Sequence, residues 1–373
     1  MTSPYRKKAA LAVACAITVA TLAAASTAAN AQSTVTLYGE LDAGLAYANN
    51  VGGHAQYQLA TGLIDGSFWG LQGSEDLGGG MKALFRLERG FSVANGEERN
   101  DHPYYVGLES ESFGTVTLGH QYDSIHDYFA PFTLTGSAGG TAFAHPFDND
   151  NANNTYLAAN AIKYTSPTLA GFTFGGMYAF SNGAGRFADN RAYSLGANYA
   201  AGSFNAGVAW LHANNRGATG AGAYDPLALP GSSGDIVDTF VQKQDTIGVG
   251  ANYAFGDVTL GAAWSRAIQT GIVDADSGAG LPSIAFSNYE LNAVWQVTPT
   301  VSLTGMYVYT KASSAHWNEG GVQAIYQLSK RTDVYAETLY QRATAGAPAA
   351  INAFDPSSGR NQLVVATGIR HRF

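Results

Sequence analysis

The side chains best suited to chemistry gather in one stretch of the chain, where His120, Asp123, His126 and Asp127 lie close together. Imidazole and carboxylate groups at such spacing are typical of metal sites and of hydrolytic centres. On a strand, however, residues three apart point to opposite faces, so these groups converge only if a loop brings them together. We therefore predict no catalytic residue and no metal site here, and we expect that the chain is not an enzyme.

Two further motifs imitate binding loops but lack an essential feature. The stretch Asp148-Asn149-Asp150-Asn151-Ala152 has the spacing of a calcium loop, yet Ala152 stands where an oxygen ligand is needed. Gly78-Gly79-Gly80 would cradle a phosphate only if a helix followed it, and the pattern predicts a turn without a helix. We expect no cofactor.

The composition indicates a β-sheet protein that is low in charge. Of 373 residues, 13% are charged, while 45 are glycine and 21 are tyrosine. An ordinary soluble domain carries about a quarter charged residues, and a disordered chain would be richer in charge and poorer in aromatics. The formal charge of -8 excludes a strongly basic nucleic-acid-binding protein, and a single cysteine, Cys15, excludes a disulfide scaffold.

Residues 1–31 have the features of a secretory signal peptide. A basic segment, Arg6-Lys7-Lys8, precedes an uncharged, alanine-rich stretch, and Ala29-Asn30-Ala31 has the form of a cleavage site. Removal of these residues would leave residues 32–373 as the mature protein. The mature chain would have 17 basic and 28 acidic residues, a formal charge of -11, and no cysteine.

The mature chain consists of segments in which apolar and polar residues alternate, as expected for strands with one apolar face. In residues 247–255, for example, Ile, Val, Ala, Tyr and Phe share one face. Short and long breaks between the segments alternate along the chain. Short breaks include 256–257 and 298–300. Long breaks lie near 50–61, 124–158, 214–240, 268–283 and 344–361. We count sixteen strands.

Short turns on one side and long loops on the other are typical of an outer-membrane barrel. In lipid every backbone N–H and C=O must be paired within the protein, so a sheet must close on itself. The lipid face must be apolar while the lumen can be polar, which produces the alternation. The predicted fold is therefore all-β, a 16-stranded antiparallel transmembrane β-barrel in the bacterial outer membrane.

Several segments resemble those of the Gram-negative general porins, in particular those of β-proteobacteria such as Burkholderia and Bordetella. In chain order they are the opening strand Val35–Gly44, the strand and turn Gly70–Gly80, the stretches Leu118–Asp123 and His145–Asn151 at the ends of a long third loop, and the closing strand Gly368–Phe373. The resemblance covers the whole mature chain.

This resemblance implies a water-filled channel through which small hydrophilic solutes and ions diffuse passively. It implies a homotrimer in contact with outer-membrane lipids and lipopolysaccharide, and a third loop, about 124–158, that folds into the barrel. It further implies that Phe373 is the assembly signal read by the barrel-insertion machinery. His120, on an outward face by parity, would contact a neighbouring subunit at Glu97 or Glu98 in that subunit's second loop.

Parity predicts which side chains face the lumen. Glu40 and Asp42 oppose Leu37 and Leu41, so both carboxylates should point inward. By the same argument Lys82, Arg86 and Glu88 of a later strand point inward. Lys163, which opposes Ile162 and Tyr164, should also line the pore.

Related porins usually carry a wall of arginines that faces an acidic third loop, as the resemblance implies. At the matching positions this chain has Phe68, His102 and Leu157. Lys82, Arg86 and Lys163 would then be what is left of the basic wall. The candidates for the acidic loop are Asp123, Asp127, Asp148 and Asp150, each of which could instead brace the loop. With few cations in the wall and a charge of -11, we predict weak selectivity for cations.

Three other functions stay open at this point. A substrate-specific outer-membrane channel differs from a general porin only in the detail of its loops. An outer-membrane barrel enzyme would need a Ser/His/Asp set at the membrane rim, and we find no such cluster in the sequence. An adhesin or structural barrel would be expected to have a plugged lumen or a large passenger domain.

Overall fold

A computed structural model describes residues 33–214, 229–230, 236–237, 239–274, 277–313, 315–344 and 346–373. The proposed signal peptide, residues 1–31, lies outside these residues. No helix in the described part of the chain is long and apolar enough to cross a membrane.

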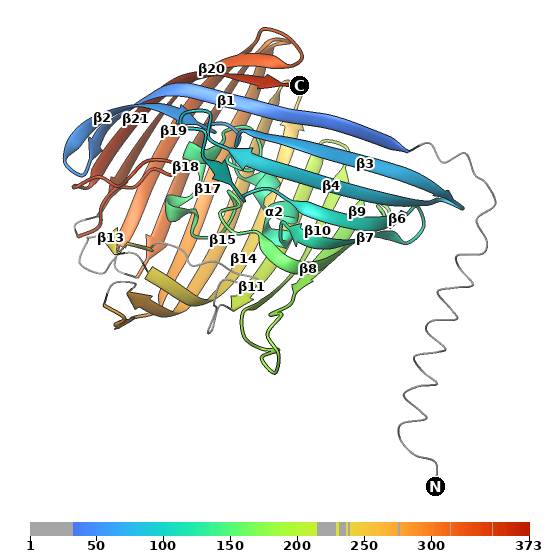
Figure 1. Cartoon of the computed structure of the whole chain (residues 1–373). Coiled ribbons are helices and arrows are strands. Elements are labelled where there is room, and N and C mark those ends of the chain that lie inside the picture. Colours follow the sequence, from blue (N-terminus) through green and yellow to red (C-terminus); the bar gives the residue numbers. More distant parts are fainter. Residues whose placement is uncertain are drawn as a thin grey trace.

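The described chain forms a closed antiparallel β-barrel of sixteen strands, seen in Figure 1. The barrel strands are β1 (Thr34–Val51), β2 with β3 (His54–Thr61 and Phe68–Gly78, counted as one strand with a break), β4 (Met81–Phe91), β6 (Tyr104–Ser110), β7 (Gly114–Gln121), β8 (Ala158–Thr165), β9 (Phe172–Ala179), β10 (Arg191–Ala201), β11 (Phe204–Asn214), β14 (Thr239–Phe255), β15 (Val258–Asp274), β17 (Ile284–Thr298), β18 (Val301–Ala312), β19 (Ala315–Gln327), β20 (Thr332–Ala343) and β21 (Asn361–Arg372). Short additional strands are β5 (Glu98–Arg99), β12 (Leu229–Pro230), β13 (Ile236–Val237) and β16 (Gly280–Leu281).

The barrel closes where the first and last strands pair. β1 lies antiparallel to β21, from Glu40 opposite Arg372 to Ala48 opposite Val364. On its other side β1 pairs with β2 and β3. The predicted number of strands and their antiparallel order are therefore confirmed.

The prediction of a long loop at residues 50–61 was wrong. β1 continues to Val51, and Gly52 and Gly53, both with positive φ, form a tight turn into β2. Glycine adopts positive φ without steric cost, so a tight hairpin turn is possible here. The strand then breaks at residues 62–67, and this segment turns into the barrel before β3 resumes.

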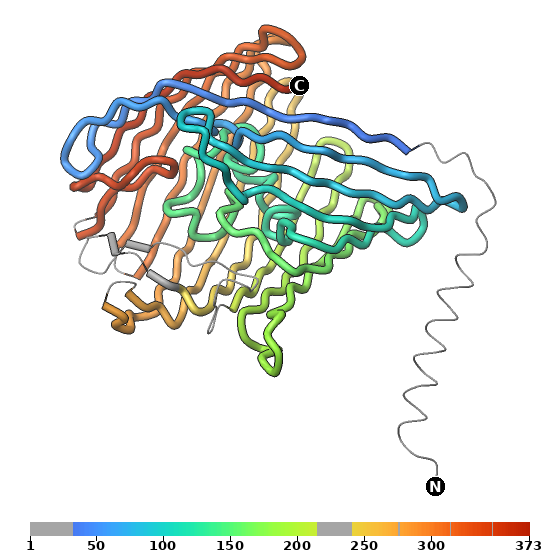
Figure 2. The backbone as a smooth tube through the Cα atoms, viewed as in Figure 1, coloured from blue at the N-terminus to red at the C-terminus, as the bar shows by residue number. Residues whose placement is uncertain are grey.

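Alternating burial follows the predicted parity of the strands. In β1, Leu37, Leu41 and Leu45 are exposed on the outer face, while Glu40 and Asp42 are buried on the inner face. The interior is filled in part by the third loop, residues 122–157, which connects β7 to β8. This loop contains α2 (Ser124–Tyr128), η1 (Ala130–Phe132), η2 (Thr141–Phe143) and η3 (Pro146–Asp148). Figure 2 shows the loop running inside the barrel, which confirms the predicted inward fold.

Candidate functional site

Aromatic side chains hold one side of the third loop against the inner wall. Tyr128, Phe129 and Phe132 are all buried, and they pack against glycines of the inner wall. The glycines beneath them are Gly196 on β10, Gly207 on β11, and Gly248 and Gly250 on β14. A Cβ atom placed at Gly248 would lie 2.4 Å from the ring of Phe129, closer than real contacts allow. We call these three rings and four glycines the aromatic anchor.

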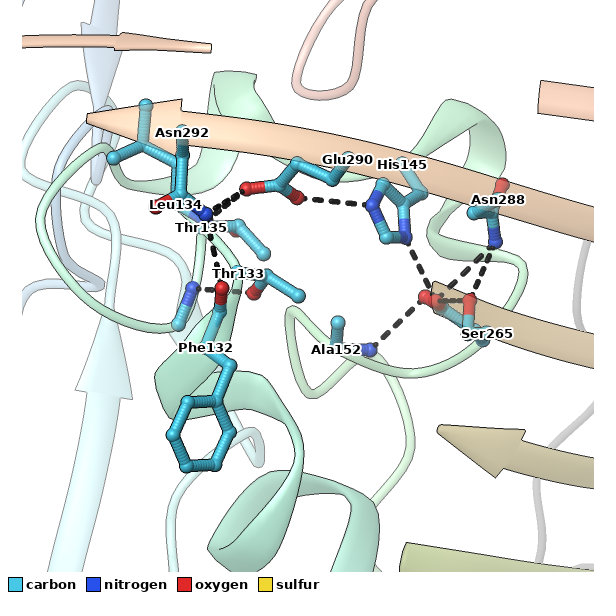
Figure 3. A network of polar contacts seen from close by, with 12 residues as sticks. Phe132, Thr133, Leu134, Thr135, His145, Ala152, Ser265, Asn288, Glu290 and Asn292 are labelled. Carbon is cyan, nitrogen blue, oxygen red and sulfur yellow. Dashed lines mark hydrogen bonds and ion pairs between the residues drawn. The ribbon is translucent and has the colours of Figure 1, made fainter. Parts of the chain in front are cut away.

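Polar groups hold the other side of the loop against β15 and β17, as Figure 3 shows. His145 lies between two carboxylates, with Nδ1 2.7 Å from Asp150 and Nε2 3.0 Å from Glu290. Asp150 also accepts hydrogen bonds from the Ser265 hydroxyl and, at 3.2 Å, from the Asn288 amide. Glu290 accepts a further bond from the backbone N–H of residue 134 at 2.7 Å. We call these five side chains the polar anchor.

The charged groups of the polar anchor are buried away from solvent. His145, Asp150 and Glu290 are each 2% exposed or less. Burial alone would lower the pKa of His145, but the carboxylates of Asp150 and Glu290 outweigh it and raise this pKa well above its ordinary value. Burial would raise the pKa of Asp150, and His145 reverses this and lowers it. The arrangement is an imidazolium held between two carboxylates.

Two of the predicted acidic-loop residues brace the loop from inside. Asp123 caps α2 by accepting a bond from the Ile125 N–H at 2.5 Å, and it accepts another from the Asn151 amide at 2.6 Å. Asp148 accepts bonds from two backbone N–H groups of the same loop, at 2.9 and 3.0 Å. Burial raises the pKa of Asp123 to about 6 and that of Asp148 to about 7. The side chains of Asp123, Asp148 and Asp150 are buried, so they do not present charge to an open channel surface.

The fourth, Asp127, joins the loop to β8, the strand that follows it in the chain. It forms an ion pair with Lys163 of β8 and lies 3.0 Å from His126. Lys163 also donates to the carbonyl of Tyr122 at 3.1 Å. Burial would raise the pKa of Asp127, but Lys163 and His126 outweigh this and lower it. The structure places Leu157, just before β8, in a buried position.

Arg86 lies at the centre of a second inward cluster. Its Nε donates to Glu88 at 2.7 Å and to the Tyr38 hydroxyl at 3.0 Å, and Tyr38 donates to Glu88 at 2.5 Å. His102 Nδ1 lies 3.5 Å from Glu88, and its ring packs on Phe68 with centroids 4.7 Å apart. Glu88 is buried, whereas the Arg86 side chain stays 35% exposed. The structure therefore brings together four of the residues that parity and resemblance selected separately: Phe68, Arg86, Glu88 and His102.

A third inward cluster lies at the closing strand, and the sequence analysis did not select its cations. Arg370 pairs with Asp65 at 2.7 Å and with Asp333 at 3.2 Å. Arg372 pairs with Glu40 at 3.0 Å and with Asp333 at 3.2 Å. Alternation in the last strand places both arginines opposite its apolar row, and this pattern could have identified them as inward residues. Asp65 carried no local signal, because it enters the barrel only through the break between β2 and β3.

Asp42 lies next to this cluster without a direct ion pair. It accepts backbone N–H bonds from Ile64 at 2.7 Å and Asp65 at 3.1 Å, and a bond from the Tyr335 hydroxyl at 2.6 Å. Its carboxylate fixes the inward segment between β2 and β3.

Lys82, the remaining predicted cation, pairs with Glu109 at 3.5 Å and is 45% exposed.

Three predicted contact residues and the predicted assembly signal lie on the outer side or in loops. His120 shares the outer face of β7 with exposed Leu118, and its ring lies 6.2 Å from that of Tyr104. Glu97 and Glu98 are exposed in the second loop, where Glu98 pairs with Arg89 at 2.7 Å.

The terminal Phe373 pairs through its backbone with Gly39, at 3.0 and 3.3 Å, and its ring is 40% exposed. In the part of the chain that the structure describes, no group of three or more His, Cys, Asp or Glu side chains is arranged to hold a metal ion.

Comparisons with known proteins agree with this architecture. Residues 16–346 match the Gram-negative porin family. An outer membrane porin protein of Bordetella pertussis is 29% identical, over 96% of this chain and 99% of its own length. Outer membrane porin protein 32 of Delftia acidovorans is also 29% identical, over 94% of this chain and 97% of its own.

Among solved structures, the anion-selective porin from Comamonas acidovorans superimposes with a TM-score of 0.74 at 24% identity. The match covers 92% of this chain and all of that one. The trimer form of OmpT from Vibrio cholerae gives a TM-score of 0.64 at 16% identity, over 91% of this chain and 99% of that one. At these identities the likeness shows the fold.

Proposed function

Given that the chain belongs to the Gram-negative porin family, and is an outer-membrane channel and not an enzyme, we propose that small hydrophilic solutes and ions cross it by passive diffusion, with a weak preference for cations. The observation that carries this proposal is the third loop, which is anchored inside the barrel on the walls from β9 to β17. A sixteen-stranded barrel is wide enough for an aqueous channel. The passage would run between the loop and the wall that carries the inward clusters of Arg86 on β4 and Arg370 on β21.

The charges along this passage support the preference for cations. Arg86 with Glu88, and Lys163 with Asp127, offset one another as pairs. The cluster at the closing strand is unequal: its two guanidinium groups, Arg370 and Arg372, pair with three carboxylates, of which Asp65 is exposed. The three are Glu40, Asp65 and Asp333. An excess of fixed negative charge in a narrow channel favours cations.

The test is the reversal potential of a single channel in a planar bilayer, in a gradient of dilute potassium chloride. We expect the sign for cation selectivity at neutral pH, fading in molar salt because the screening length falls from about 10 Å at 0.1 M to about 3 Å at 1 M. An anion-selective sign, as named for the porin from Comamonas acidovorans, would overturn the cation preference and leave the channel function standing. Linear current at rising solute concentration supports passive diffusion, and saturation would argue for a substrate-specific channel.

We also propose that the channel is a homotrimer. The OmpT structure from Vibrio cholerae is described as a trimer, and His120 and Leu118 present an outward face on β7. Glu97 would be the partner for His120 of a neighbouring subunit, because Glu98 already pairs with Arg89. Native mass spectrometry in mild detergent should give a trimer that His120→Ala weakens, with Lys82→Ala, an inward cation, as the control. A wild-type monomer would refute the proposal.

Phe373 is proposed as the signal read by the insertion machinery. Its ring lies on the outer face beside the closing seam between β1 and β21, where a receptor could reach it. Deletion of Phe373 should reduce the amount of folded protein in the outer membrane while export continues. Phe255→Ala, which removes an exposed ring elsewhere, serves as the control. Unchanged assembly after the deletion would contradict the proposal.

A further inference from the structure

Three neighbouring strands, β18, β19 and β20, carry polar side chains at the same level of the inner wall (Figure 1). Thr304 of β18 lies opposite Gln323 of β19, which in turn lies opposite Glu337 of β20. All three are buried, with exposed fractions of 4%, 1% and 4%, whereas the adjacent residues Leu303 and Val322 are exposed on the outer face. Directly opposed residues of an antiparallel sheet have Cβ atoms about 4.5–5.5 Å apart. The three side chains are therefore neighbours on the inner face, and we call them the oxygen triplet.

Each member of the oxygen triplet has a buried oxygen that no hydrogen-bond partner reaches within the described part of the chain. These atoms are Thr304 Oγ1, Gln323 Oε1 and Glu337 Oε1. The orientation of the Gln323 amide follows from its contacts, because its Nε2 donates to the carbonyl of Gly139 at 2.7 Å and to Glu337 at 2.9 Å. A flipped amide would turn an oxygen toward these two acceptors. Oε1 is therefore the atom left over, and the Thr304 hydroxyl donates to neither of its neighbours.

The carboxylate of Glu337 lacks a counter-charge among the described residues. The guanidinium groups of the closing strand pair with other carboxylates, Asp333 and Glu40. The charged side chain that acts on Glu337 is Asp42, which has the same sign. The next inward residues on β18 and β20 are Met306 and Leu339, both apolar and buried. A buried carboxylate without a partner is strongly unfavourable, so Glu337 requires either a proton or a cation.

The set of oxygens favours a cation over a proton. A proton shared between two oxygens would leave the third without a partner, whereas a metal ion is bound by several oxygens at once. Carboxylate, carbonyl and hydroxyl oxygens are the ligands that hard cations prefer. The triplet contains one carboxylate, whose charge a monovalent ion balances. A divalent ion would leave an excess positive charge in a buried site.

We propose that the oxygen triplet binds a monovalent alkali cation of the size of sodium in the wall formed by β18, β19 and β20. The ion would fix the Gln323 amide, which holds the carbonyl of Gly139 in the third loop. Phe143 of the same loop packs over Gly321, two residues before Gln323, where an added Cβ would lie 2.7 Å from its ring. The bound ion would therefore stabilise the position of this part of the loop. The site lies in the wall and does not depend on which ions prefer the passage.

The test is thermal unfolding of the full protein in detergent, followed by circular dichroism. Replacement of sodium by N-methylglucamine, a cation too large for the site, at constant ionic strength should lower the unfolding temperature of the wild type by several degrees. The reason is that a ligand which binds only the folded state stabilises it. Glu337→Gln keeps the size of the side chain and should abolish this response. Thr304→Val should require about tenfold more sodium, as expected for the loss of one polar contact to a charged group.

Glu319→Gln is the matched control. Glu319 is also a buried inward carboxylate of this wall, accepts a bond from a glutamine, Gln341, at 2.6 Å, and has one oxygen without a partner. The carbonyl oxygen of Gln341, however, accepts the N–H of Ala350 at 2.6 Å, so no second free oxygen lies beside Glu319. Glu319→Gln should therefore respond to sodium as the wild type does.

A second measurement needs no variant. Crystals of the wild type grown with thallium(I), a heavy monovalent cation, should show an anomalous peak between Thr304, Gln323 and Glu337. A peak only at other positions would overturn the proposal, as would an equal response to sodium in the wild type and in Glu337→Gln. Loss of the response in Glu319→Gln would also overturn it, because any buried carboxylate would then suffice. An infrared band of a protonated carboxyl that Glu337→Gln removes would show that a proton balances the charge, and the proposal would fail.

Discussion

The two anchors of the third loop hold it by opposite means. In the aromatic anchor the wall residues beneath the loop are glycines, and the rings of Tyr128, Phe129 and Phe132 fill the space that side chains would occupy. In the polar anchor the wall contributes Ser265, Asn288 and Glu290, which meet complementary charges on the loop. One anchor depends on shape and the other on charge, so they should respond to different perturbations.

The two kinds of contact suggest different roles for the aromatic anchor and the polar anchor. Contact between rings and backbone is non-directional and tolerates small shifts. A buried imidazolium between two carboxylates contributes little net stability, because desolvation offsets attraction, but it tolerates no alternative partner. We infer that the aromatic anchor supplies most of the binding energy of the loop, and that the polar anchor fixes its position.

The largest effect is expected from Glu290→Ala. The substitution removes one carboxylate from His145 and leaves the N–H of Leu134 without its acceptor. Breaking a buried ion pair costs about 3–5 kcal/mol, so urea unfolding in detergent should shift strongly and single-channel noise should rise. Glu109→Ala, which breaks a largely exposed pair with Lys82, is the control and should cost under about 1 kcal/mol. A small effect of Glu290→Ala would mean that the polar anchor is dispensable.

Gly248→Val should have the next largest effect, because a Cβ there collides with the ring of Phe129. Overpacking of this kind costs about 1–3 kcal/mol. If the loop moves away from the wall in response, channel conductance should change without any change in charge. Gly305→Val is the matched control, since the nearest atoms to a Cβ at Gly305 lie 3.5 Å away. Equal conductance and stability in both variants would show that the rings can move aside.

The buried titratable groups on the polar side of the loop should make the stability of the loop depend on pH. His145 has a raised pKa, so its contribution to stability is complete below its unfolded value of about 6.5 and is lost as the pH rises through the folded value. Asp123 and Asp148, whose pKa values are raised to about 6 and about 7, act in the same direction: the stability of the loop falls from about pH 4 to about pH 7 as they ionise.

Asp150 has a lowered pKa, so its contribution is lost only as the pH falls below its ordinary value. The loop should therefore be held best in mildly acidic solution and least at alkaline pH. Channel noise recorded from pH 5 to pH 9 measures this. Noise should rise with pH in the wild type and in Gly248→Val, and His145→Leu should flatten the rise above pH 7. A rise of the same size in His145→Leu would contradict the assignment to the polar anchor.

The smallest effect is expected from Ser265→Ala. It removes the hydrogen bond that a neutral hydroxyl donates to Asp150, which keeps His145, the Asn288 amide and a backbone N–H. Because the carboxylate retains these donors, the cost should lie below the range of about 1.5–3 kcal/mol that is typical of a hydrogen bond to a charged group. Urea unfolding in detergent should resolve the change in stability. Ser287→Ala, on the outer face of β17, is the control. A cost equal to that of Glu290→Ala would mean that the network fails as one unit.

The alternation of residue types made the barrel and its faces predictable. The inward positions of Glu40, Asp42, Arg86 and Lys163 followed from a period of two, which the closed sheet preserves along every strand. The same rule, applied to the last strand, puts Arg370 and Arg372 on the inner face, although the sequence analysis did not select them. The hairpin at residues 50–61 was missed, because its glycine turn and its flanking polar residues looked like a long loop.

The interior of the third loop was not predictable in the same way. Asp148 and Asp150 are identical in type and lie two residues apart, yet the pKa of one is raised and that of the other lowered. The difference comes from His145 and from Ser265, which both contact Asp150, and Ser265 is 115 residues away from Asp150 in the chain. No periodic pattern encodes a contact between an irregular loop and a distant strand, so only the folded structure distinguishes the two carboxylates.

The seam between β1 and β21 has a consequence for how the molecule can form. Pairing of Glu40 with Arg372 joins the two ends of the barrel sequence, and until that pairing exists the sheet has two open edges that can join other chains. Contacts at such sequence separation form slowly, because chain entropy opposes them. A partly translocated chain would therefore stay open and prone to aggregation. Protection of nascent edges, rather than stability of the finished barrel, would then set the yield of this protein in the cell.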